Sequence, residues 1–487
     1  MERRKRLSAL ILLLALTVTS CGTTALPDAA PESDTKPVTD PENKEWYSSL
    51  GDRDFGGKSF RVLSRNEVNW PQAIPEMGSG EETGEVLSDA LYNRNRIVEE
   101  RFKMKFETEY YDNAESSLRS SILANDDIAD IAFVSLSSGA SLQKEDLLCD
   151  LTQSSAFNFD AEYWDQNAVR ELSICKKLYL MCGDLTPMTG QGTWAIFFSK
   201  DLVDKNNLED PYALVDSDNW TYEKLYQMSS AVSNDLNGDS VMDEHDQYGL
   251  LTQYGDVQMF IQAFGENYTK NDKDGIPQLA IGGSARSFDV METISKLFSD
   301  ESTLVSDRFG GKYSEYHTVS VQTPCFNEGR ALFYVSGILR LFSLRDVDLD
   351  FGLLPIPKYD GDQTSYHHTV KPTWGSCVCI PKPAAFEDAA FILEALAAAS
   401  HDTVKPAYFS TTLGTKLMRD ERSYDMLDVI LSTRSYDAMT LYNWGGLIAS
   451  LNSAISENTG DLASTIESSK QSVTGEIEQM ISQISGE

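Results

Sequence analysis

Short β-rich runs alternate with amphipathic helical stretches along much of the chain, and this alternation sets the class of fold. A β-rich run at residues 60–63 precedes a helical stretch at 87–102, which is followed by a second run at 105–109. After another helical stretch, residues 130–134 form a third run. Strands and helices that alternate in this way predict an α/β fold.

The first twenty residues predict an export signal. Four basic residues at 3–6 precede an apolar stretch at 7–18, which is shorter than the about 20 residues needed to cross a bilayer. Residues 18–21 resemble a bacterial lipobox, in which the chain is cleaved on the N-terminal side of the cysteine and the cysteine thiol carries the lipid. We therefore expect a lipoprotein signal peptide at 1–20, acyl chains such as palmitate on Cys21, and anchoring on the extracytoplasmic face of the cell membrane. The alternative is an ordinary secretory signal with a chance cysteine.

Residues 21–50 predict the lipidated cysteine and a flexible tether. Between residues 22 and 45 the chain holds four prolines among alanine, threonine, aspartate and glutamate, with almost no large apolar residue. Such a segment buries too little surface to offset the entropy lost on ordering.

The charge of the chain excludes one large class of partners. The formal net charge is −34, and no acidic block concentrates it in the folded body. A chain this acidic does not attract nucleic acid or an anionic membrane surface through its overall field. We expect no nucleic-acid partner, and membrane association through the lipid anchor alone.

Six cysteines remain when Cys21 is set aside, and their spacing fixes no role for them. No Cys-X-X-Cys occurs, so the spacing of a structural zinc site is absent. Six cysteines could form three disulfides, although a chain of this length needs none for stability. We favour buried free thiols at Cys149, Cys175, Cys182, Cys325, Cys377 and Cys379.

One acidic loop matches the ligand schedule of an EF-hand calcium site. In a twelve-residue loop, side-chain oxygens fall at positions 1, 3, 5, 9 and 12, and position 7 offers its backbone carbonyl. Ser240 replaces the usual glycine at position 6, and the last ligand is Asp rather than Glu. The alternative is an acidic surface turn. The predicted structural Ca²⁺ ligands are Asp235, Asn237, Asp239, Val241, Asp243 and Asp246.

The sequence carries none of the short motifs of common catalytic sites. HExxH, GxSxG, the P-loop and a GxGxxG after a strand are all absent. An acid-rich chain offers many carboxylate pairs for glycoside hydrolysis, but the spacing singles out none. We expect a protein that is not an enzyme, with no catalytic residues and no organic cofactor.

Seven short landmarks occur in a characteristic order. They are 130–133 (DIAF), 147–151 (LLCDL), 177–180 (KLYL), 194–202 (WAIFFSKDL), 219–223 (NWTYE), 326–332 (FNEGRAL) and 351–357 (FGLLPIP). Together they resemble the family 1 extracellular solute-binding proteins, the maltose-binding-protein-like receptors of ABC importers. Ser199 stands where the family usually has Asn, and residues 182–184 replace its usual proline.

The resemblance implies a two-lobed periplasmic-binding-protein-like fold of type II, with the lobes joined by a hinge of crossing segments. Lobe one would comprise 51–187 plus 375–402, and lobe two 190–360 plus 403–487. Loops at the carboxyl ends of the strands would face a cleft between the lobes, as in open α/β sheets generally.

Aromatic rings with small or polar neighbours are the candidate ligand contacts. Sugars stack their C–H faces on such rings while polar groups bind the hydroxyls. Trp194, Trp374 and Trp444 each lie beside glycine or small polar residues. The resemblance implies that residues following the strands also face the ligand. The predicted set is Arg65, Asn66, Trp70, Ser137, Ser138, Gln191, Trp194, Tyr334, Ser336, Trp374 and Trp444.

The resemblance implies a receptor that captures a small solute, most simply an oligosaccharide, and delivers it to the transmembrane permease of an ABC importer. Two alternatives come from other classes of protein. One is a cell-surface glycoside hydrolase or lyase, and the other is an adhesion lipoprotein with no transport partner.

Overall fold

A computed structural model of the chain describes residues 50–66, 75–126, 128–313, 318–382, 384–459 and 461–486. The predicted signal peptide, Cys21 and nearly all of the tether lie outside these residues, as does Trp70. The described residues belong to one compact unit. No helix among them is long and apolar enough to cross a membrane.

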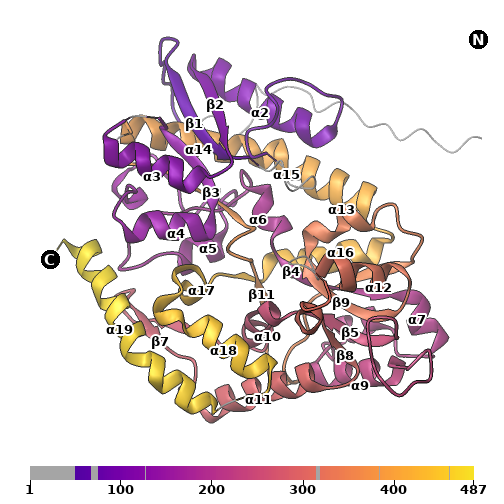
Figure 1. The fold of residues 1–487 in the computed structure, drawn as a ribbon. Helices are drawn as coiled ribbons and strands as arrows, with labels where there is room; N and C mark the ends of the chain where they lie inside the picture. The colour runs from indigo at the N-terminus through magenta and orange to yellow at the C-terminus, as the bar shows by residue number, and fades with distance from the viewer. Residues whose placement is uncertain are drawn as a thin grey trace, which may run out of the picture. The chain divides into compact units, whose positions relative to one another are not determined.

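The first of two main sheets has the strand order β12-β3-β1-β2 (Figure 1). Its strands are β1 (Ser59–Arg65), β2 (Lys105–Tyr111), β3 (Ile131–Ser135) and β12 (Ser376–Cys379). β1 pairs in parallel with β2 and β3, and β12 is antiparallel to β3. The helices packed around this sheet are α2 (Val86–Phe102), α3 (Ala114–Ala124), α4 (Leu136–Lys144) and α14 (Phe386–Asp402).

The second main sheet has the order β10-β4-β9-β5-β8. Its strands are β4 (Trp194–Ser199), β5 (Tyr248–Thr252), β8 (Thr303–Val305), β9 (Ala331–Gly337) and β10 (Phe351–Leu354). The helices that contact it are α7 (Lys200–Lys205), α8 (Pro211–Asp216), α9 (Tyr222–Val232), α11 (Ala285–Ser299), α12 (Thr323–Asn327) and α16 (Glu421–Ser432). The predicted β-rich runs at 60–63, 105–109 and 130–134 are confirmed as β1 to β3.

The chain passes between the two sheets at three places. The first crossing segment is 183–193, which contains α6 (Pro187–Gln191). The second crossing segment is 355–375, which contains β11 (His368–Thr369). The third connection follows α14 and contains α15 (Val404–Pro406) and a π-helix at Ala407–Leu417. These connections give the protein the two-lobed α/β fold that the landmarks predict.

Smaller elements complete the described chain. Two of them pair in a hairpin, β6 (Thr269–Asn271) with β7 (Pro277–Leu279). The others are α5 (Gln166–Glu171), α10 (Val257–Ala263), α13 (Leu341–Leu344), β13 (Arg434–Ser435), α17 (Ala438–Tyr442), α18 (Leu447–Ser456) and α19 (Leu462–Ser485).

Helix α19, near the C-terminus, packs against neighbouring elements through one apolar face. Its buried face comprises Ile466, Val473, Ile477, Met480 and Ile484, as the period of its apolar residues predicts. Asp461 caps the helix by accepting hydrogen bonds from the backbone N–H groups of residues 463 and 464. The helix runs beside α18 and β7 (Figure 1) and contacts the 3₁₀ helix η8 (Trp444–Gly446). Lys177 Nζ donates to the carbonyl of Ile484 at 2.7 Å.

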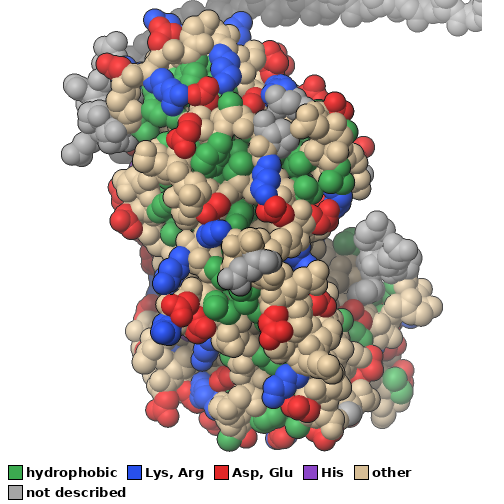
Figure 2. Space-filling view, turned by 90° about the vertical axis from the view of Figure 1, so that its left-hand side faces the viewer, with side chains coloured by type: hydrophobic (Ala, Val, Ile, Leu, Met, Phe, Trp, Pro, Cys, Tyr) green, Lys and Arg blue, Asp and Glu red, His purple; other side chains and the backbone are tan. Residues whose placement is uncertain are grey.

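Charged side chains do not gather by sign on the face drawn in Figure 2, where acidic and basic groups are interspersed. This distribution agrees with the diffuse acidic charge of the sequence.

Candidate ligand-binding site

The second crossing segment makes a turn, residues 371–375, that lies against the carboxyl ends of strands from both sheets. The N–H groups of Leu136 and Ser137, at the start of α4, donate to the carbonyls of Gly375 and Pro372, each at 3.0 Å. The N–H of Lys371 donates to Gly192 O in the first crossing segment at 2.9 Å. The members of this strand-end cluster, as we call it, are Arg65, Ser137, Ser138, Gln191, Trp194, Asp256, Ser336, Lys371 and Trp374.

Arg65 holds the turn in place. Its guanidinium donates to the carbonyls of Thr373 at 3.3 Å and Trp374 at 2.9 Å, and to Ser376 Oγ at 3.0 Å. The sequence predicts Arg65 as a direct ligand contact. In the structure these three hydrogen bonds fix the backbone that carries the Trp374 ring, and its role as a ligand contact stays a prediction.

Trp374 and Trp194 form an aromatic pair that is shared by a lysine. Their ring centroids lie 4.8 Å apart. Lys371 Nζ lies 4.6 Å from the centroid of Trp374 and 4.9 Å from that of Trp194, so it makes a cation–π contact with both. Trp374 is partly exposed, whereas Trp194 is fully buried.

Beneath this pair lies a buried carboxylate that sequence reasoning did not find. Asp256 accepts hydrogen bonds from Trp194 Nε1 and Thr252 Oγ1, each at 3.0 Å. Burial raises the pKa of Asp256 to about 6, although Lys371 and these hydrogen bonds act in the opposite direction. Burial also lowers the pKa of Lys371. No short motif surrounds either residue, so the sequence offers no signal for this pair.

Hydroxyl groups lie at the N-terminus of α4, next to the same turn. Ser135 caps the helix by accepting from Ser138 N at 3.1 Å, and its Oγ lies 2.8 Å from Ser138 Oγ and 3.1 Å from Ser137 Oγ. Ser137 and Ser138 are half-buried. Both hydroxyls have protein partners, since Ser138 also hydrogen-bonds the Glu115 carboxylate, and they keep acceptor lone pairs for a ligand at the carboxyl end of β3.

Two of the three predicted stacking tryptophans have no open ring face in this structure. Trp194 is covered by Trp374 and Lys371, and Trp444 is stacked on Tyr442 at 5.0 Å. The neighbouring glycines serve chain packing instead of ligand approach. A Cβ at Gly192 would lie 2.8 Å from Gly375 N, and one at Gly445 would lie 2.8 Å from a methyl group of Val473.

The remaining predicted residues are divided between buried and peripheral positions. Tyr334 is buried against Phe197 and Phe326 in the core beside the second sheet. Asn66 donates to Asp112 Oδ1 at 2.7 Å, beyond the end of β2. Gln191 and Ser336 are buried beside the turn, where neither has an exposed surface for a ligand.

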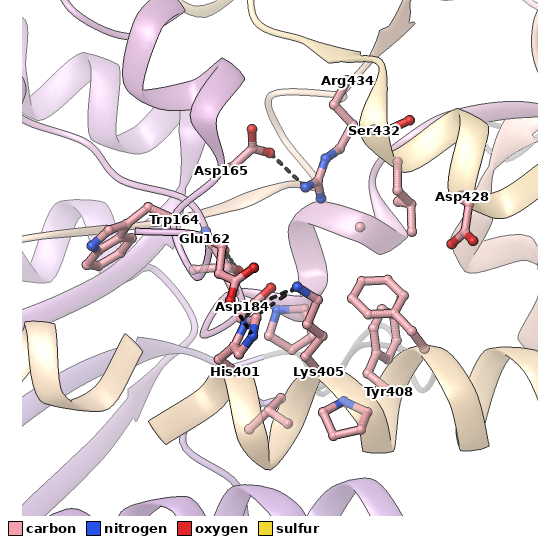
Figure 3. A pocket seen from close by; sticks show the side chains of 18 of the residues that line it. Glu162, Trp164, Asp165, Asp184, His401, Lys405, Tyr408, Asp428, Ser432 and Arg434 are labelled. Carbon is pink, nitrogen blue, oxygen red and sulfur yellow. Dashed lines mark hydrogen bonds and ion pairs between the residues drawn. The ribbon is translucent and has the colours of Figure 1, made fainter. Parts of the chain in front are cut away.

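A separate pocket with a volume of about 800 Å³ is lined by α5, the first crossing segment, α15, the π-helix, α16 and β13. Figure 3 shows that its charged groups face one another. His401 Nδ1 lies 2.6 Å and Lys405 Nζ 3.3 Å from Asp184 Oδ2, and Arg434 Nη2 lies 2.8 Å from Asp165 Oδ2. The hydrogen bond with Asp184 raises the pKa of His401. None of the predicted ligand-binding residues lines this pocket.

The predicted calcium loop has part of the expected geometry. Ser240, at the position of the usual glycine, has a left-handed backbone with φ +67°. However, both carboxylate oxygens of Asp235 accept from backbone N–H groups, those of Gly238 and Ser240, each at 2.7 Å. Asp246 is buried and likewise accepts from two backbone N–H groups. The backbone therefore fits a cation-binding turn, but the carboxylates of Asp235 and Asp246 already accept hydrogen bonds from backbone N–H groups.

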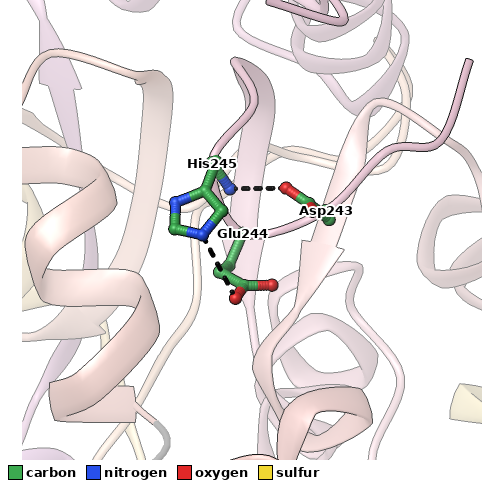
Figure 4. Close-up of side chains that lie close together, drawn as sticks. All are labelled: Asp243, Glu244 and His245. Atoms are coloured by element: carbon green, nitrogen blue, oxygen red, sulfur yellow. Dashed lines mark hydrogen bonds and ion pairs between the residues drawn. The ribbon is translucent and has the colours of Figure 1, made fainter. Parts of the chain in front are cut away.

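Within the described residues, one group of acidic and histidine side chains brings three possible metal ligands within 4.8 Å, namely Asp243, Glu244 and His245 (Figure 4). Glu244 is engaged by Lys312 and by Tyr313 OH at 2.9 Å. Burial alone would raise the pKa of Glu244, but these hydrogen bonds lower it to about 2. Calcium binding by the loop stays a prediction.

No family model and no curated protein sequence matches the chain. Solved structures of sugar-binding proteins share its fold. The sugar-binding protein MalE from Xanthomonas citri has a TM-score of 0.58 at 13% identity, covering 88% of this chain and 100% of that one. A cyclo/maltodextrin-binding protein complexed with maltotetraose has a TM-score of 0.55 at 14% identity, covering 88% and 99%.

A third structure is an ABC substrate-binding protein from Listeria monocytogenes in complex with cycloalternan. Its TM-score is 0.52 at 12% identity, covering 88% of this chain and 99% of that one. These likenesses show that the chain has the two-lobed fold of ABC substrate-binding proteins.

Proposed function

We propose that this protein is a family 1 solute-binding receptor that captures a carbohydrate for an ABC importer. The observation that carries the proposal is the strand-end cluster. The turn that carries the partly exposed Trp374 lies there against the start of α4, which holds Ser137 and Ser138. The fold supports the same conclusion, because proteins with this architecture bind maltotetraose and cycloalternan.

The geometry suggests how a sugar would be held. The exposed part of the Trp374 ring contacts the C–H groups of a sugar ring, and Ser137 and Ser138 exchange hydrogen bonds with its hydroxyls. Arg65 keeps the Trp374 backbone in place through its three hydrogen bonds. A ligand that also contacts the second sheet's strand ends favours the closed arrangement of the lobes, because it makes those contacts only there.

The attachment and the transport partner rest on the sequence. Cys21 would carry the lipid, and the segment up to residue 50 would hold the folded body away from the membrane surface. The solute would then be passed to a transmembrane permease. Cys21→Ser should release the protein from the membrane fraction, and an acylated, membrane-bound variant would refute the lipobox assignment.

A ligand screen followed by scattering tests the receptor function. Binding to the native state raises the melting temperature by mass action, so a panel of oligosaccharides should contain members that stabilise the protein. The stabilising sugar should also compact the protein in small-angle scattering and should be recovered intact. Release of a cleaved sugar would support a glycoside hydrolase or lyase instead. Stabilisation by no sugar in the panel would contradict the carbohydrate assignment.

A further inference from the structure

Two cysteines lie opposite each other at the edge of the first sheet. Met181 N–H donates to Val378 O at 3.0 Å, and Val378 N–H donates to Met181 O at 2.9 Å. Residues that exchange both bonds form a hydrogen-bonded antiparallel pair, so the next pair, Cys182 and Cys377, is a non-hydrogen-bonded one. The Cα atoms of such a pair are about 4.5 Å apart, and both side chains project from the same face of the sheet.

The packing of α4 confirms on which face the sulfurs lie. A Cβ added at Gly139 of α4 would lie 2.9 Å from Cys377 Sγ and 2.7 Å from Leu180 Cδ2. Leu180 and Cys182 are two residues apart in an extended segment, so they share that face. Both cysteines are free and fully buried. Burial raises the pKa of Cys182, and the neighbouring Cys377 raises it further.

We propose that Cys182 and Cys377 are a disulfide-forming pair. Cα atoms joined by disulfides are usually 4.4–6.8 Å apart, so the separation typical of a non-hydrogen-bonded pair falls within the bonding range. Elsewhere the described strand pairings do not place cysteine opposite cysteine. Cys379 lies opposite Ala132, and the Leu148–Pro381 bridge places Cys149 opposite Ile380.

The reaction is an exchange with an external disulfide, such as that of a thiol–disulfide oxidoreductase or of oxidised glutathione. One cysteine thiolate attacks the oxidant and releases its first thiol, which leaves a mixed disulfide on the protein. The second thiolate attacks the protein sulfur of that mixed disulfide and releases the second thiol. Two protons and two electrons thus pass from the protein to the oxidant. The disulfide proposal rests on the proposed function in one respect only: the extracytoplasmic location of the receptor supplies the oxidant.

The position of the pair determines what the bond would do. Cys182 directly precedes the first crossing segment, and Cys377 is the second residue of β12, just after the second crossing segment. The bond would therefore join the first-sheet ends of two connections and enclose the whole second sheet in one loop. A loop of this length strongly restricts the unfolded chain, so the bond should stabilise the fold. Because both sulfurs are buried, it would form while the chain folds, before α4 covers them.

Peptide mapping tests the proposal directly. The full chain is refolded with oxidised glutathione, its free thiols are alkylated, and it is digested without reduction. We expect one linked peptide that joins Cys182 to Cys377, and a melting temperature higher than that of the reduced protein by on the order of 5 °C. Cys182→Ser should abolish both results. The matched control is Cys379→Ser, which changes a cysteine two residues away in β12 and should leave both unchanged.

Two outcomes would overturn the pairing. They are full alkylation of both Cys182 and Cys377 in the refolded wild type, and a linked peptide that joins either residue to another cysteine. The mapping is performed on the wild type, so it does not depend on whether a variant folds. It also requires no sugar, and therefore a negative sugar screen with a positive map would refute the receptor function alone.

Discussion

The strand-end cluster and the pocket beside α16 differ in how their polar groups are used. In the pocket, Asp184 is paired with His401 and Lys405, and Asp165 is paired with Arg434. In the strand-end cluster, the half-buried Ser137 and Ser138 lie next to the turn that carries a partly exposed tryptophan.

If the strand-end cluster is the ligand site, as we propose, volume alone does not identify it. The pocket has a volume of about 800 Å³, yet its ion pairs join segments of the chain that meet there. Asp184 belongs to the first crossing segment, His401 lies at the end of α14, and Lys405 lies in α15 within the third connection. These groups stabilise the junction. The strand-end cluster instead combines an apolar ring with hydroxyls, which is the chemistry that sugar recognition requires.

The largest effect should come from Trp194, the fully buried member of the cluster's aromatic pair. Trp194→Ala should lower the free energy of unfolding by about 3–5 kcal/mol, because it leaves a cavity and removes the donor to Asp256. Urea unfolding measures this change. An unchanged stability together with a loss of sugar affinity would mean that Trp194 faces the ligand.

A binding effect of about 2–4 kcal/mol should come from Trp374. Trp374→Ala should weaken binding of the sugar found by screening to this extent, while the protein remains folded. Calorimetric titration measures the change. Phe409→Ala is the matched control, because Phe409 is an aromatic residue that lines the pocket. If the control weakens binding and Trp374→Ala does not, the pocket is the ligand site.

Asp256 should give the cluster a pH signature. Burial raises its pKa from 3.8 to about 6, so the folded state binds a proton more tightly than the unfolded state. Its contribution to stability is therefore complete below pH 4 and is lost as the pH rises to 6, by roughly 3 kcal/mol. The stability difference between wild type and Asp256→Asn, measured at pH 4, 5, 6 and 7, should fall and then level off. A constant difference would contradict this assignment.

His401 should give the pocket the complementary signature at higher pH. Its pKa is raised by Asp184, so the stabilisation is present below pH 6.5 and is lost as the pH rises through the folded-state value. Thermal melts of wild type and His401→Gln between pH 5 and 9 should converge at the alkaline end. Curves that stay parallel would show that the ion pair with Asp184 makes no net contribution.

The smallest effect is expected at the loop 235–246, which lies outside both regions. With millimolar calcium and the weak affinity typical of extracellular modules, binding should add about 1 kcal/mol of stability. Chelator should lower the melting temperature of the wild type, and replacing calcium should restore it. Asp235→Ala combined with Asp239→Ala should melt identically under both conditions. If chelator does not change the melting temperature of the wild type either, the loop is an acidic turn that binds no calcium.

The fold could be predicted well because its signals are local. Short β-rich runs predicted β1 to β3, and the apolar face of α19 followed from its spacing. The site could be predicted only in part, because it depends on long-range packing. Gly192 and Gly445 resemble residues that let a ligand approach Trp194 and Trp444, but they admit Gly375 and Val473 instead.

Other features of the site leave no sequence signal at all. Asp256 and Lys371 are far apart in the chain and come together only when the second crossing segment folds against the end of β5. The opposition of Cys182 and Cys377 likewise depends on strand register, which the spacing of cysteines does not reveal.

The paired indoles of Trp194 and Trp374 give this protein an intrinsic fluorophore at the point where we place the sugar. One ring is shielded from water, the other is partly hydrated, and a single ammonium lies within 5 Å of both ring centroids. A sugar that displaced water from Trp374 would change the emission of this unit without any attached dye. The same chain could therefore report its own occupancy in a cuvette, and ligand arrival could be timed by stopped flow.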